Sequence, residues 1–461
     1  MSAPLSPAPV VVPPAPGSSP VAGTGESLPL WRKLLSPLSS LRLTVVLLAF
    51  SVLVVFFGTL AQTEDGLYLA QNRYFRSWFS TWSPLTEGWR WIVIPLPGGY
   101  LLGTLLLTNL VAAHATRFKF TWKKSGILLS HLGVVLLLVG QLFTDMLARE
   151  SRMTFSEGEW RNYSEDFTAS ELAILSDAPG NGMAEVVAIP EGRLQTGEMI
   201  RHERLPFTVR VSQWLPNSEP IFRAPRATNG PPQSSSPVSK RFDFISVAET
   251  HKMDEKNIPT VLIELMDTGG KSIGSWALSV WSGDPAMAKS ARTSWYRRFN
   301  RGDTSGDDSQ ARMMAGQLHA FLTEEQAVTV DKRTYTLALR PRRYYQPFTL
   351  QLLKTTHEVY RGTDIPKNFQ SRVLIDHPAR GERREVNIYM NNPLRHGGLT
   401  YFQYQMGRDE FFSTPVAHSV LQVVQNPSWL TPYIGCALVA GGLLVQFGIH
   451  LVQFVRRRVT T

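Results

Sequence analysis

Long apolar runs alternate with polar sequence along this chain and divide it into distinct regions. Mostly apolar runs of roughly 17–22 residues occupy residues 41–60, 92–113, 126–143 and 433–454. An α-helix needs about 20 apolar residues to cross a hydrocarbon core of about 30 Å. A largely polar stretch, residues 147–428, separates the third run from the fourth. The pattern predicts an integral membrane protein with four transmembrane helices and one large domain outside the membrane.

Four segments follow from this pattern. Residues 1–29 are dense in Pro, Ala, Ser and Gly and are expected to be a disordered tail. The other segments are residues 30–146 with three spans and an external loop at 62–91, residues 147–428, and residues 429–461 with the last span and a basic tail.

Period-two alternation inside the polar stretch predicts strands. In "FTVRV", Phe207, Val209 and Val211 fall on one face, and "REVNIYM" alternates in the same way. Residues 260–266, 335–339, 348–352 and 372–375 follow the same pattern. Such strands, separated by turn residues, indicate a mainly antiparallel β domain. Residues 217–240 and 284–316 are rich in Ser, Gly, Pro or charge and are predicted to be long loops.

The net charge of +10 is concentrated beside the apolar runs. The basic residues there are Arg32, Lys33, Arg42, Arg117, Lys119, Lys123, Lys124, Arg456, Arg457 and Arg458. With four spans these clusters fall on one side of the membrane, which the positive-inside rule identifies as the cytoplasm. Both termini are then cytoplasmic and the β domain is external. Elsewhere the basic residues are interleaved with acids, which argues against nucleic-acid binding.

Cysteine usage and the lack of catalytic motifs restrict the chemistry. The single cysteine, Cys436, lies inside the fourth apolar run. The external domain therefore cannot form disulfides, use Cys-x-x-Cys redox chemistry or attach haem covalently to itself. The sequence contains no glycine-rich phosphate loop, H-E-x-x-H or G-x-S-x-G motif. We expect no catalytic residue in this chain.

Three histidines lie in or at the ends of the apolar runs: His114, His131 and His450. The predicted topology places all three in the cytoplasmic leaflet, with His131 roughly 10 Å into the bilayer at 1.5 Å per residue. A titratable ring inside a span costs free energy unless it is bound or paired. A neutral imidazole is a good ligand for haem iron. The alternatives are a proton relay or a hydrogen bond to a neighbouring helix, and simple interfacial placement for His114 and His450.

Three stretches resemble one protein family. They are "FFGTLAQTEDGLYLAQNRYFRSW", "KKSGILLSHLGVVLLLVG" and "NIYMNNPLRHGGLTYFQYQM". The three stretches, in this order, resemble the ResB (CcsB) cytochrome c biogenesis proteins. The predicted layout of three spans, an external domain and a final span is also similar to that family. The motif residues taken as structural are Gly58, Gln62, Asn392, Pro393, Gly398, Tyr401 and Gln403.

The resemblance implies a subunit of the system II cytochrome c synthase in a bacterial cytoplasmic membrane. Such a subunit would be non-catalytic by itself and would handle haem b, with His131 as the best match to the family's membrane ligand, followed by His114 and His450. The implied partners are a ResC/CcsA-like protein with a tryptophan-rich haem-handling segment, apocytochrome c, thiol-reducing thioredoxin-like proteins and membrane lipid.

Two other readings stay open at this point. An assembly scaffold would bind partner proteins without haem, and its histidines would only pack. A quinone- or proton-coupled redox subunit is disfavoured, because the spans have no carboxylate relay. In "NNPLRHGG" the Asn-Pro and Gly-Gly pairs are typical of turns, so we expect a structural hairpin there rather than haem or apocytochrome contact through His396.

Overall fold

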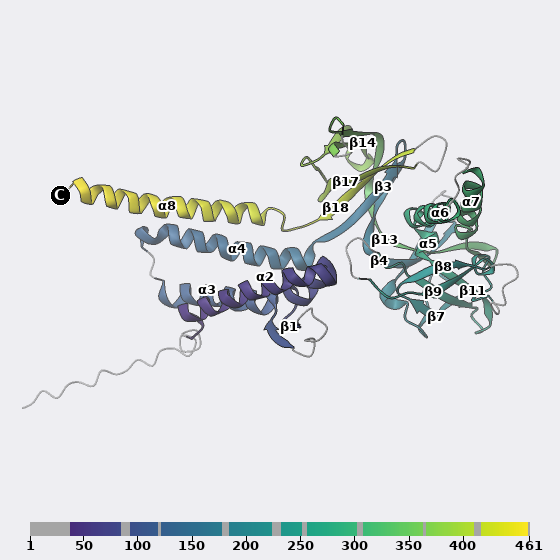
Figure 1. Ribbon diagram of the computed structural model, residues 1–461, viewed down its shortest axis with the longest axis horizontal. Coiled ribbons are helices and arrows are strands. Elements are labelled where there is room, and N and C mark those ends of the chain that lie inside the picture. Colours follow the sequence, from purple (N-terminus) through teal and green to yellow (C-terminus); the bar gives the residue numbers. More distant parts are fainter. Residues whose placement is uncertain are drawn as a thin grey trace, which may run out of the picture.

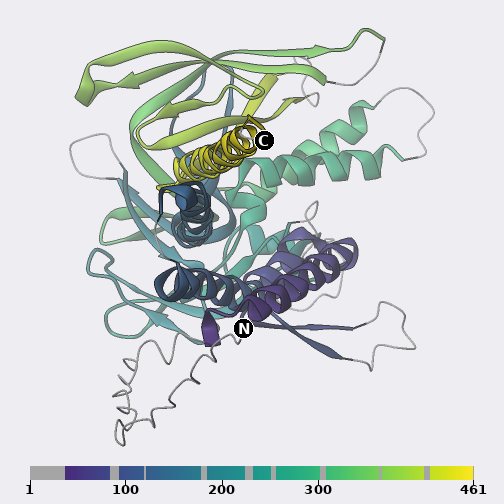
Figure 2. The same cartoon turned by 90° about the vertical axis from the view of Figure 1, so that its left-hand side faces the viewer.

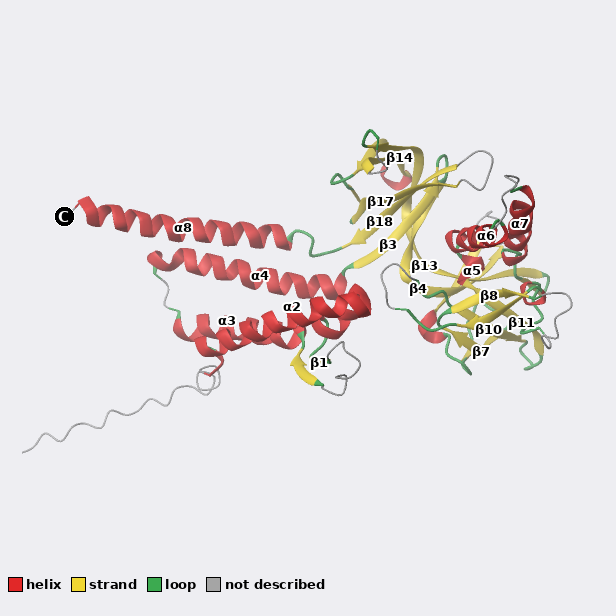
Figure 3. Ribbon diagram, viewed as in Figure 1, coloured by secondary structure: helices red, strands yellow, loops and turns green. Residues whose placement is uncertain are grey.

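The computed structural model has a bundle of helices at one end and a β-rich domain at the other (Figures 1 and 3). It describes residues 37–83, 93–118, 121–177, 184–223, 232–250, 256–301, 308–362, 366–409 and 416–459. The expected disordered tail, residues 1–29, lies outside this part of the chain.

The helical part contains the four apolar runs. Its helices are α2 (Leu41–Ala70), the π-helix η1 (Gln71–Phe75), α3 (Gly99–Arg117), the 3-10 helix η3 (Trp122–Lys124), α4 (Ser125–Leu147) and α8 (Thr431–Val459). Figure 2 looks along the bundle and shows these helices lying beside one another. Three described segments are long and apolar enough to cross a membrane: Leu41–Thr63, Trp122–Leu147 and Thr431–Val459.

The expected second span differs from the prediction at both ends. Residues 92–113 were expected to be one helix, but Ile94–Pro97 form strand β2, which pairs with β1 (Phe79–Trp82). Helix α3 begins only at Gly99, because Pro95 and Pro97 disfavour a helix there. Asn109, His114 and several threonines lower its hydropathy, and α3 is not among the three segments with span-like composition.

The expected external loop at 62–91 is largely regular structure. Helix α2 continues to Ala70, with a kink at Gly66, where φ is 78°, and η1 follows it directly. Strand β1 comes next, and residues 84–92 lie outside the described part. The apolar pattern ended the predicted helix too early, because the extension of α2 is stabilised by tertiary packing: Ala61 and Ala70 are buried in one apolar cluster with Tyr74 of η1 and Leu96 of β2.

Two sheets form most of the β domain. The large sheet has the order β15-β14-β13-β4-β3-β18-β17-β16, with β5 also paired to β4 and β12 to β13. Its strands are β3 (Arg149–Ser156), β4 (Trp160–Asp177), β5 (Ala184–Pro190), β12 (Ala327–Val330), β13 (Arg333–Val359), β14 (Pro366–His377), β15 (Glu382–Tyr389), β16 (Leu394–His396), β17 (Leu399–Asp409) and β18 (Val416–Gln425). All these pairs are antiparallel.

The second sheet has the order β11-β10-β7-β6. Its strands are β6 (Met199–Ile200), β7 (Thr208–Leu215), β10 (Thr260–Met266) and β11 (Ser272–Ser279), and β8 (Ser218–Phe222) pairs separately with β9 (Phe242–Ser246). The short helices are η4 (Glu191–Arg193), η5 (Val238–Lys240), α5 (Val280–Gly283), α6 (Pro285–Phe299), α7 (Ser309–Leu322) and η6 (Pro378–Arg380).

The domain has two lobes with separate apolar cores. The first lobe, formed by β3, β14–β18 and the adjoining halves of β4 and β13, buries Phe155, Leu350 and Leu421 in its core. The second lobe contains the other strands and α5–α7, and its main core includes Leu172 and Ile263. Strands β4 and β13 run through both lobes. The first lobe is joined directly to α4 through β3 and to α8 through β18 (Figure 1).

Each alternating segment coincides with a strand, apart from Phe207 and Met390, which lie one residue outside β7 and β15. The predicted mainly antiparallel β domain is confirmed. The long-loop predictions were wrong in part. Residues 217–240 contain β8 and η5, and residues 284–316 contain α6 and the start of α7. Asp284 caps α6 by accepting a hydrogen bond from the Ala286 backbone N–H, an N-terminal signal that the charged composition obscured.

Candidate functional site: a histidine pair between two helices

Two of the three histidines singled out in the sequence lie side by side. His114 is near the end of α3 and His131 near the start of α4. Their ring centroids are 4.8 Å apart and the ring planes are inclined at 75°, an edge-to-face arrangement. Both residues are half-buried. The fold therefore brings into contact two imidazoles that are separated by a turn of the chain.

One hydrogen bond fixes the tautomer of His114. Its Nδ1 lies 3.0 Å from the carbonyl oxygen of Leu110, one helical turn earlier. A carbonyl oxygen only accepts, so Nδ1 is the donor, and the neutral ring has its lone pair on Nε2. That Nε2 is buried and has no hydrogen-bond partner among the described residues. The ring of Phe118 stacks on the imidazole at 5.1 Å.

His131 also has an unsatisfied nitrogen. Its Nδ1 is buried without a hydrogen-bond partner in the part of the chain that the structure describes. A buried polar atom left unpaired costs about 1–3 kcal/mol. A group that forms a hydrogen bond with His131 Nδ1 would therefore stabilise this arrangement. Neutral imidazoles in apolar surroundings are a donor set that fits haem iron.

The spacing limits how the pair could bind an iron. Two imidazoles on opposite sides of one metal, with bonds of about 2 Å each, place their nitrogens about 4 Å apart and their ring centres farther still. The centroids of His114 and His131 are only 4.8 Å apart. In this arrangement one of the two rings can bind an iron, but the two cannot flank it.

His450 is not part of this pair. Helix α8 packs against α4 with Gln446 beside Gly126, and His450 follows one turn later, beyond the start of α4. The Nε2 atoms of His450 and Gln446 are 2.9 Å apart. Its ring is exposed.

Close packing of α4 on α8 fixes the direction in which His131 points. Gly126, Gly133 and Gly140, seven residues apart, are buried against α8. A Cβ added at Gly133 would lie 2.7 Å from the carbonyl oxygen of Gly435. At 3.6 residues per turn, His131 lies on another side of α4, where it meets α3.

Asn109 holds α3 against the start of α2. Its buried side chain accepts a hydrogen bond from Thr44 Oγ1 at 2.6 Å. Its Nδ2 donates to the carbonyl oxygens of Leu38 and Ser40 at 2.6 and 3.1 Å. The polar residue that lowers the hydropathy of α3 therefore has partners for each of its polar atoms, as a buried amide requires.

The outer ends of the helices are joined by an ionic contact. Asp145, near the end of α4, pairs with Arg76 Nε at 2.7 Å and accepts a hydrogen bond from Tyr100 at the start of α3. This contact connects α3, α4 and the segment after η1 at the end of the bundle nearest the β domain.

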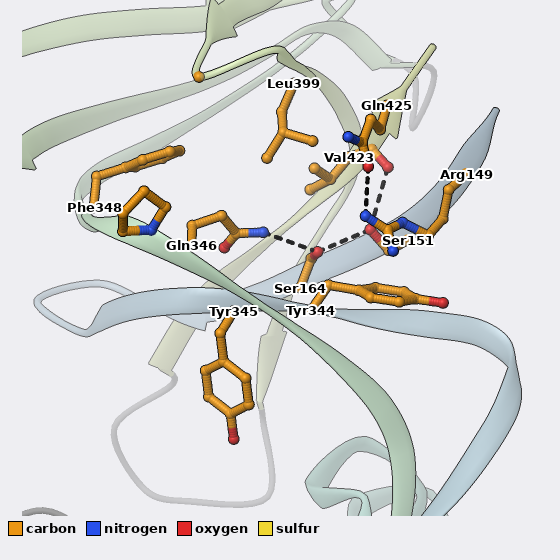
Figure 4. A pocket seen from close by; sticks show the side chains of 12 residues that line it. Arg149, Ser151, Ser164, Tyr344, Tyr345, Gln346, Phe348, Leu399, Val423 and Gln425 are labelled. Carbon is orange, nitrogen blue, oxygen red and sulfur yellow. Dashed lines mark hydrogen bonds between the residues drawn. The ribbon is translucent and has the colours of Figure 1, made fainter. Parts of the chain in front are cut away.

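A polar cavity lies in the first lobe among β3, β4, β13, β17 and β18 (Figure 4). Its volume is about 180 Å³. Ser151 and Ser164, joined at 2.9 Å, lie on one side. The Arg149 guanidinium lies 4.0 Å from the ring centroid of Tyr344 and donates to Gln425. Pockets for drug-sized ligands occupy about 300–1,000 Å³, so this cavity is too small for haem.

The "NNPLRHGG" stretch forms a tight hairpin beside the last helix. His396 pairs with Leu399, and the intervening Gly397 and Gly398 have φ values of 60° and 78°, as a two-residue hairpin turn requires. The guanidinium of Arg395 lies 4.4 Å from the ring centroid of Trp429, in the segment leading to α8. This geometry supports the structural reading of the motif.

Other motif residues also have packing roles. Tyr401 is fully buried in the core of the first lobe, and burial raises the pKa of its hydroxyl. Gln403 accepts a hydrogen bond from Ser371 at 2.7 Å and donates to Ser419 at 3.1 Å.

The remaining motif residues lie at bends and helix contacts. A Cβ at Gly58 would be 3.0 Å from the ring of Phe75, and half-buried Gln62 is one turn farther along α2. The backbone of Asn392 exchanges hydrogen bonds with Tyr389, and half-buried Pro393 leads into β16.

A second pair of histidines was missed in the sequence. The rings of His377 and His396 are 5.6 Å apart, and both pack on Phe348. Burial lowers the pKa of His396, although Glu382 lies 3.9 Å away. Nothing in the sequence indicates that His377 and His396 are close, because only the fold brings the ends of β14 and β16 together. Among the described residues no group of three or more His, Cys, Asp or Glu could hold a metal ion.

Comparison with known proteins agrees with the motifs. A model of the ResB-like family matches residues 313–414, which include the β16–β17 hairpin and the buried Tyr401. Protein NrfI of Wolinella succinogenes is 30% identical over 121 residues, which are 26% of this chain. The aligned part spans only 13% of the length of that relative. Together with the apolar helices and the β domain, these matches make the chain similar to the ResB-like family.

Proposed function

We propose that this chain is a haem-handling subunit for cytochrome c biogenesis, and that His131 binds haem iron inside the membrane. The observation that supports this most directly is the pair of half-buried imidazoles in contact between the apolar helices α3 and α4. The similarity of residues 313–414 to the ResB-like family supports cytochrome c biogenesis as the process that such a site would serve.

The proposal includes a four-span topology with both termini in the cytoplasm. Helix α3 is then the second span despite its polar residues, because Asn109 has partners within the bundle and His114 is bonded to its own helix. Haem would be cargo, received near the cytoplasmic side and passed to a ResC/CcsA-like partner that presents it to an apocytochrome c. When bound, haem would supply an iron centre that accepts one imidazole nitrogen.

In this proposal each part of the chain has a defined task. Helix α8 and its glycine contacts orient α4, so that His131 faces α3. The contact between Asp145 and Arg76 holds the outer end of the same helices together. The first lobe, fused to α4 and α8 without long linkers, would dock the partner or the apocytochrome outside the membrane.

The deciding experiment is a visible absorption spectrum of the complex purified through this chain. The wild type should show a haem Soret band. His131→Ala should lose most of it, whereas His450→Ala, the matched control, should keep it. Full haem absorbance in His131→Ala would overturn the ligand assignment. A wild-type complex without haem that still supports cytochrome c maturation would instead favour the scaffold function.

A further inference from the structure

The two unsatisfied ring nitrogens of the histidine pair are complementary. His114 donates from Nδ1 to the Leu110 carbonyl, so its buried Nε2 has only a lone pair to offer. His131 has a buried Nδ1 that can be a donor. One atom needs a hydrogen and the other can supply it, and the two rings are already in edge-to-face contact.

The distance between the rings suits such a bond. A nitrogen donor and its acceptor prefer a separation of about 2.9 Å, which fits between ring centres 4.8 Å apart after a small rotation of one ring. No other described side chain satisfies either atom. The backbone carbonyl of Ile127, one turn earlier on α4, is near the His131 ring but makes no hydrogen bond of normal geometry to Nδ1. A direct bond between the rings would satisfy both buried nitrogens at once.

We propose that His114 is a positioning residue for His131: His114 Nε2 accepts a hydrogen bond from His131 Nδ1 and leaves the lone pair of His131 Nε2 free for haem iron. This inference rests on the proposed function. Two hydrogen bonds in series would then connect the Leu110 carbonyl, His114 and His131, and His131 would hold the metal. Ligating histidines commonly donate their other N–H to a fixed acceptor, which sets the tautomer and makes the ligand more basic.

The same geometry argues against the simpler idea that both rings bind iron. The centroid distance is too short for ligands on opposite sides of one metal. The two residues also have unequal roles, because Nδ1 of His114 makes a 3.0 Å hydrogen bond to the Leu110 carbonyl, whereas Nδ1 of His131 makes no bond of such geometry among the described residues.

The first test uses the full chain without haem. Selective ¹⁵N labelling of histidine reports which ring nitrogen is protonated, and His114→Leu and His131→Ala assign the two signals. Both residues should be Nδ1–H tautomers in the wild type, and His114→Leu should shift His131 toward Nε2–H. A wild-type His131 with its hydrogen on Nε2 would overturn the inference.

The second test measures haem in the purified complex. His114→Leu should lower haem affinity about 10–100-fold and make the midpoint potential more positive, because the remaining ligand is less basic. His114→Gln, whose amide oxygen can accept the bond, should recover part of both changes, and His450→Leu should match the wild type. Equal affinities and potentials for the Leu and Gln variants would overturn the role of His114 as acceptor. Haem retained by His131→Ala would overturn the proposed function instead.

Discussion

Gly397 and Gly398 need the same backbone conformation but have different surroundings. Both have positive φ values, which L side chains rarely adopt. A Cβ at Gly397 would also lie 2.8 Å from Phe348 Cε1, whereas a Cβ at Gly398 would meet nothing within 4 Å. The first glycine is thus required by backbone conformation and by packing, and the second by conformation alone.

Gly397→Ala should therefore destabilise the β domain more than Gly398→Ala. Backbone strain costs about 1–3 kcal/mol in each variant, and displacement of a core ring adds about 1–3 kcal/mol for Gly397→Ala only. Thermal unfolding of the purified protein, followed by circular dichroism, gives the order of the midpoints. Equal midpoints for the two variants would contradict the packing argument.

Among the elements, α4 and α8 are the most closely packed helices, and glycine makes this possible. Each α4 glycine faces α8 backbone or a small side chain, as at Gly140 and Thr431. Small residues allow helix backbones to approach in membranes, where there is little hydrophobic driving force between helices. Because His131 lies between two of these glycines, the interface also sets the position of the imidazole.

Gly133→Ala should separate α4 from α8. The new methyl group would lie 2.7 Å from both the Gly435 carbonyl oxygen and Val439 Cγ2, and overpacking of this kind costs about 1–3 kcal/mol. The thermal midpoint in detergent should fall. Gly448→Ala on α8, where a Cβ would meet nothing within 4 Å, is the matched control and should leave the midpoint unchanged or slightly raised.

At the scale of the whole molecule, polar contacts link β13 to β4, the two strands that run through both lobes. Arg340 and Glu171, both buried, form an ion pair at 3.1 Å where β13 and β4 pass from one core to the other. Tyr344 donates a 2.6 Å hydrogen bond to Asp166 in the same region. Burial and this bond raise the pKa of Tyr344 to about 12.

The contact between Tyr344 and Asp166 predicts an acid dependence of stability. Burial alone would raise the pKa of Asp166, but hydrogen bonds from Tyr344 and from the Ala169 and Thr168 backbone lower it. Because the folded pKa is depressed, this stabilisation is present above the unfolded value, about 3.9, and is lost as pH falls through the folded value.

Tyr344→Phe should lower stability by about 1–3 kcal/mol at pH 7, and the difference from wild type should shrink below pH about 4. Unfolding midpoints measured at pH 7 and pH 3 provide the check. Tyr389→Phe, at an exposed position on β15, is the control. A difference for Tyr344→Phe that is the same at both pH values would contradict the argument.

Much of the architecture could be predicted from the sequence because it depends on local periodicity. The apolar runs at α2, α4 and α8 are continuous, and period two marks most of the core strands. Boundaries were less predictable. The α2 extension and β2 depend on contacts with each other, and the prolines before α3 were hidden inside an apolar run. The spacing of seven residues between Gly126, Gly133 and Gly140 is a sequence signal of close helix packing. Apolar periodicity alone does not capture it.

The sequence by itself determined that the chain has membrane-type helices, a mainly β domain and histidines in apolar surroundings, because composition and periodicity are properties of neighbouring residues. Only the tertiary structure decided which histidines meet. The rings of His114 and His131 come together because α3 and α4 pack side by side, whereas α8 places His450 beyond the start of α4. The tautomer of His114 likewise depends on the Leu110 carbonyl, whose direction a folded helix alone defines.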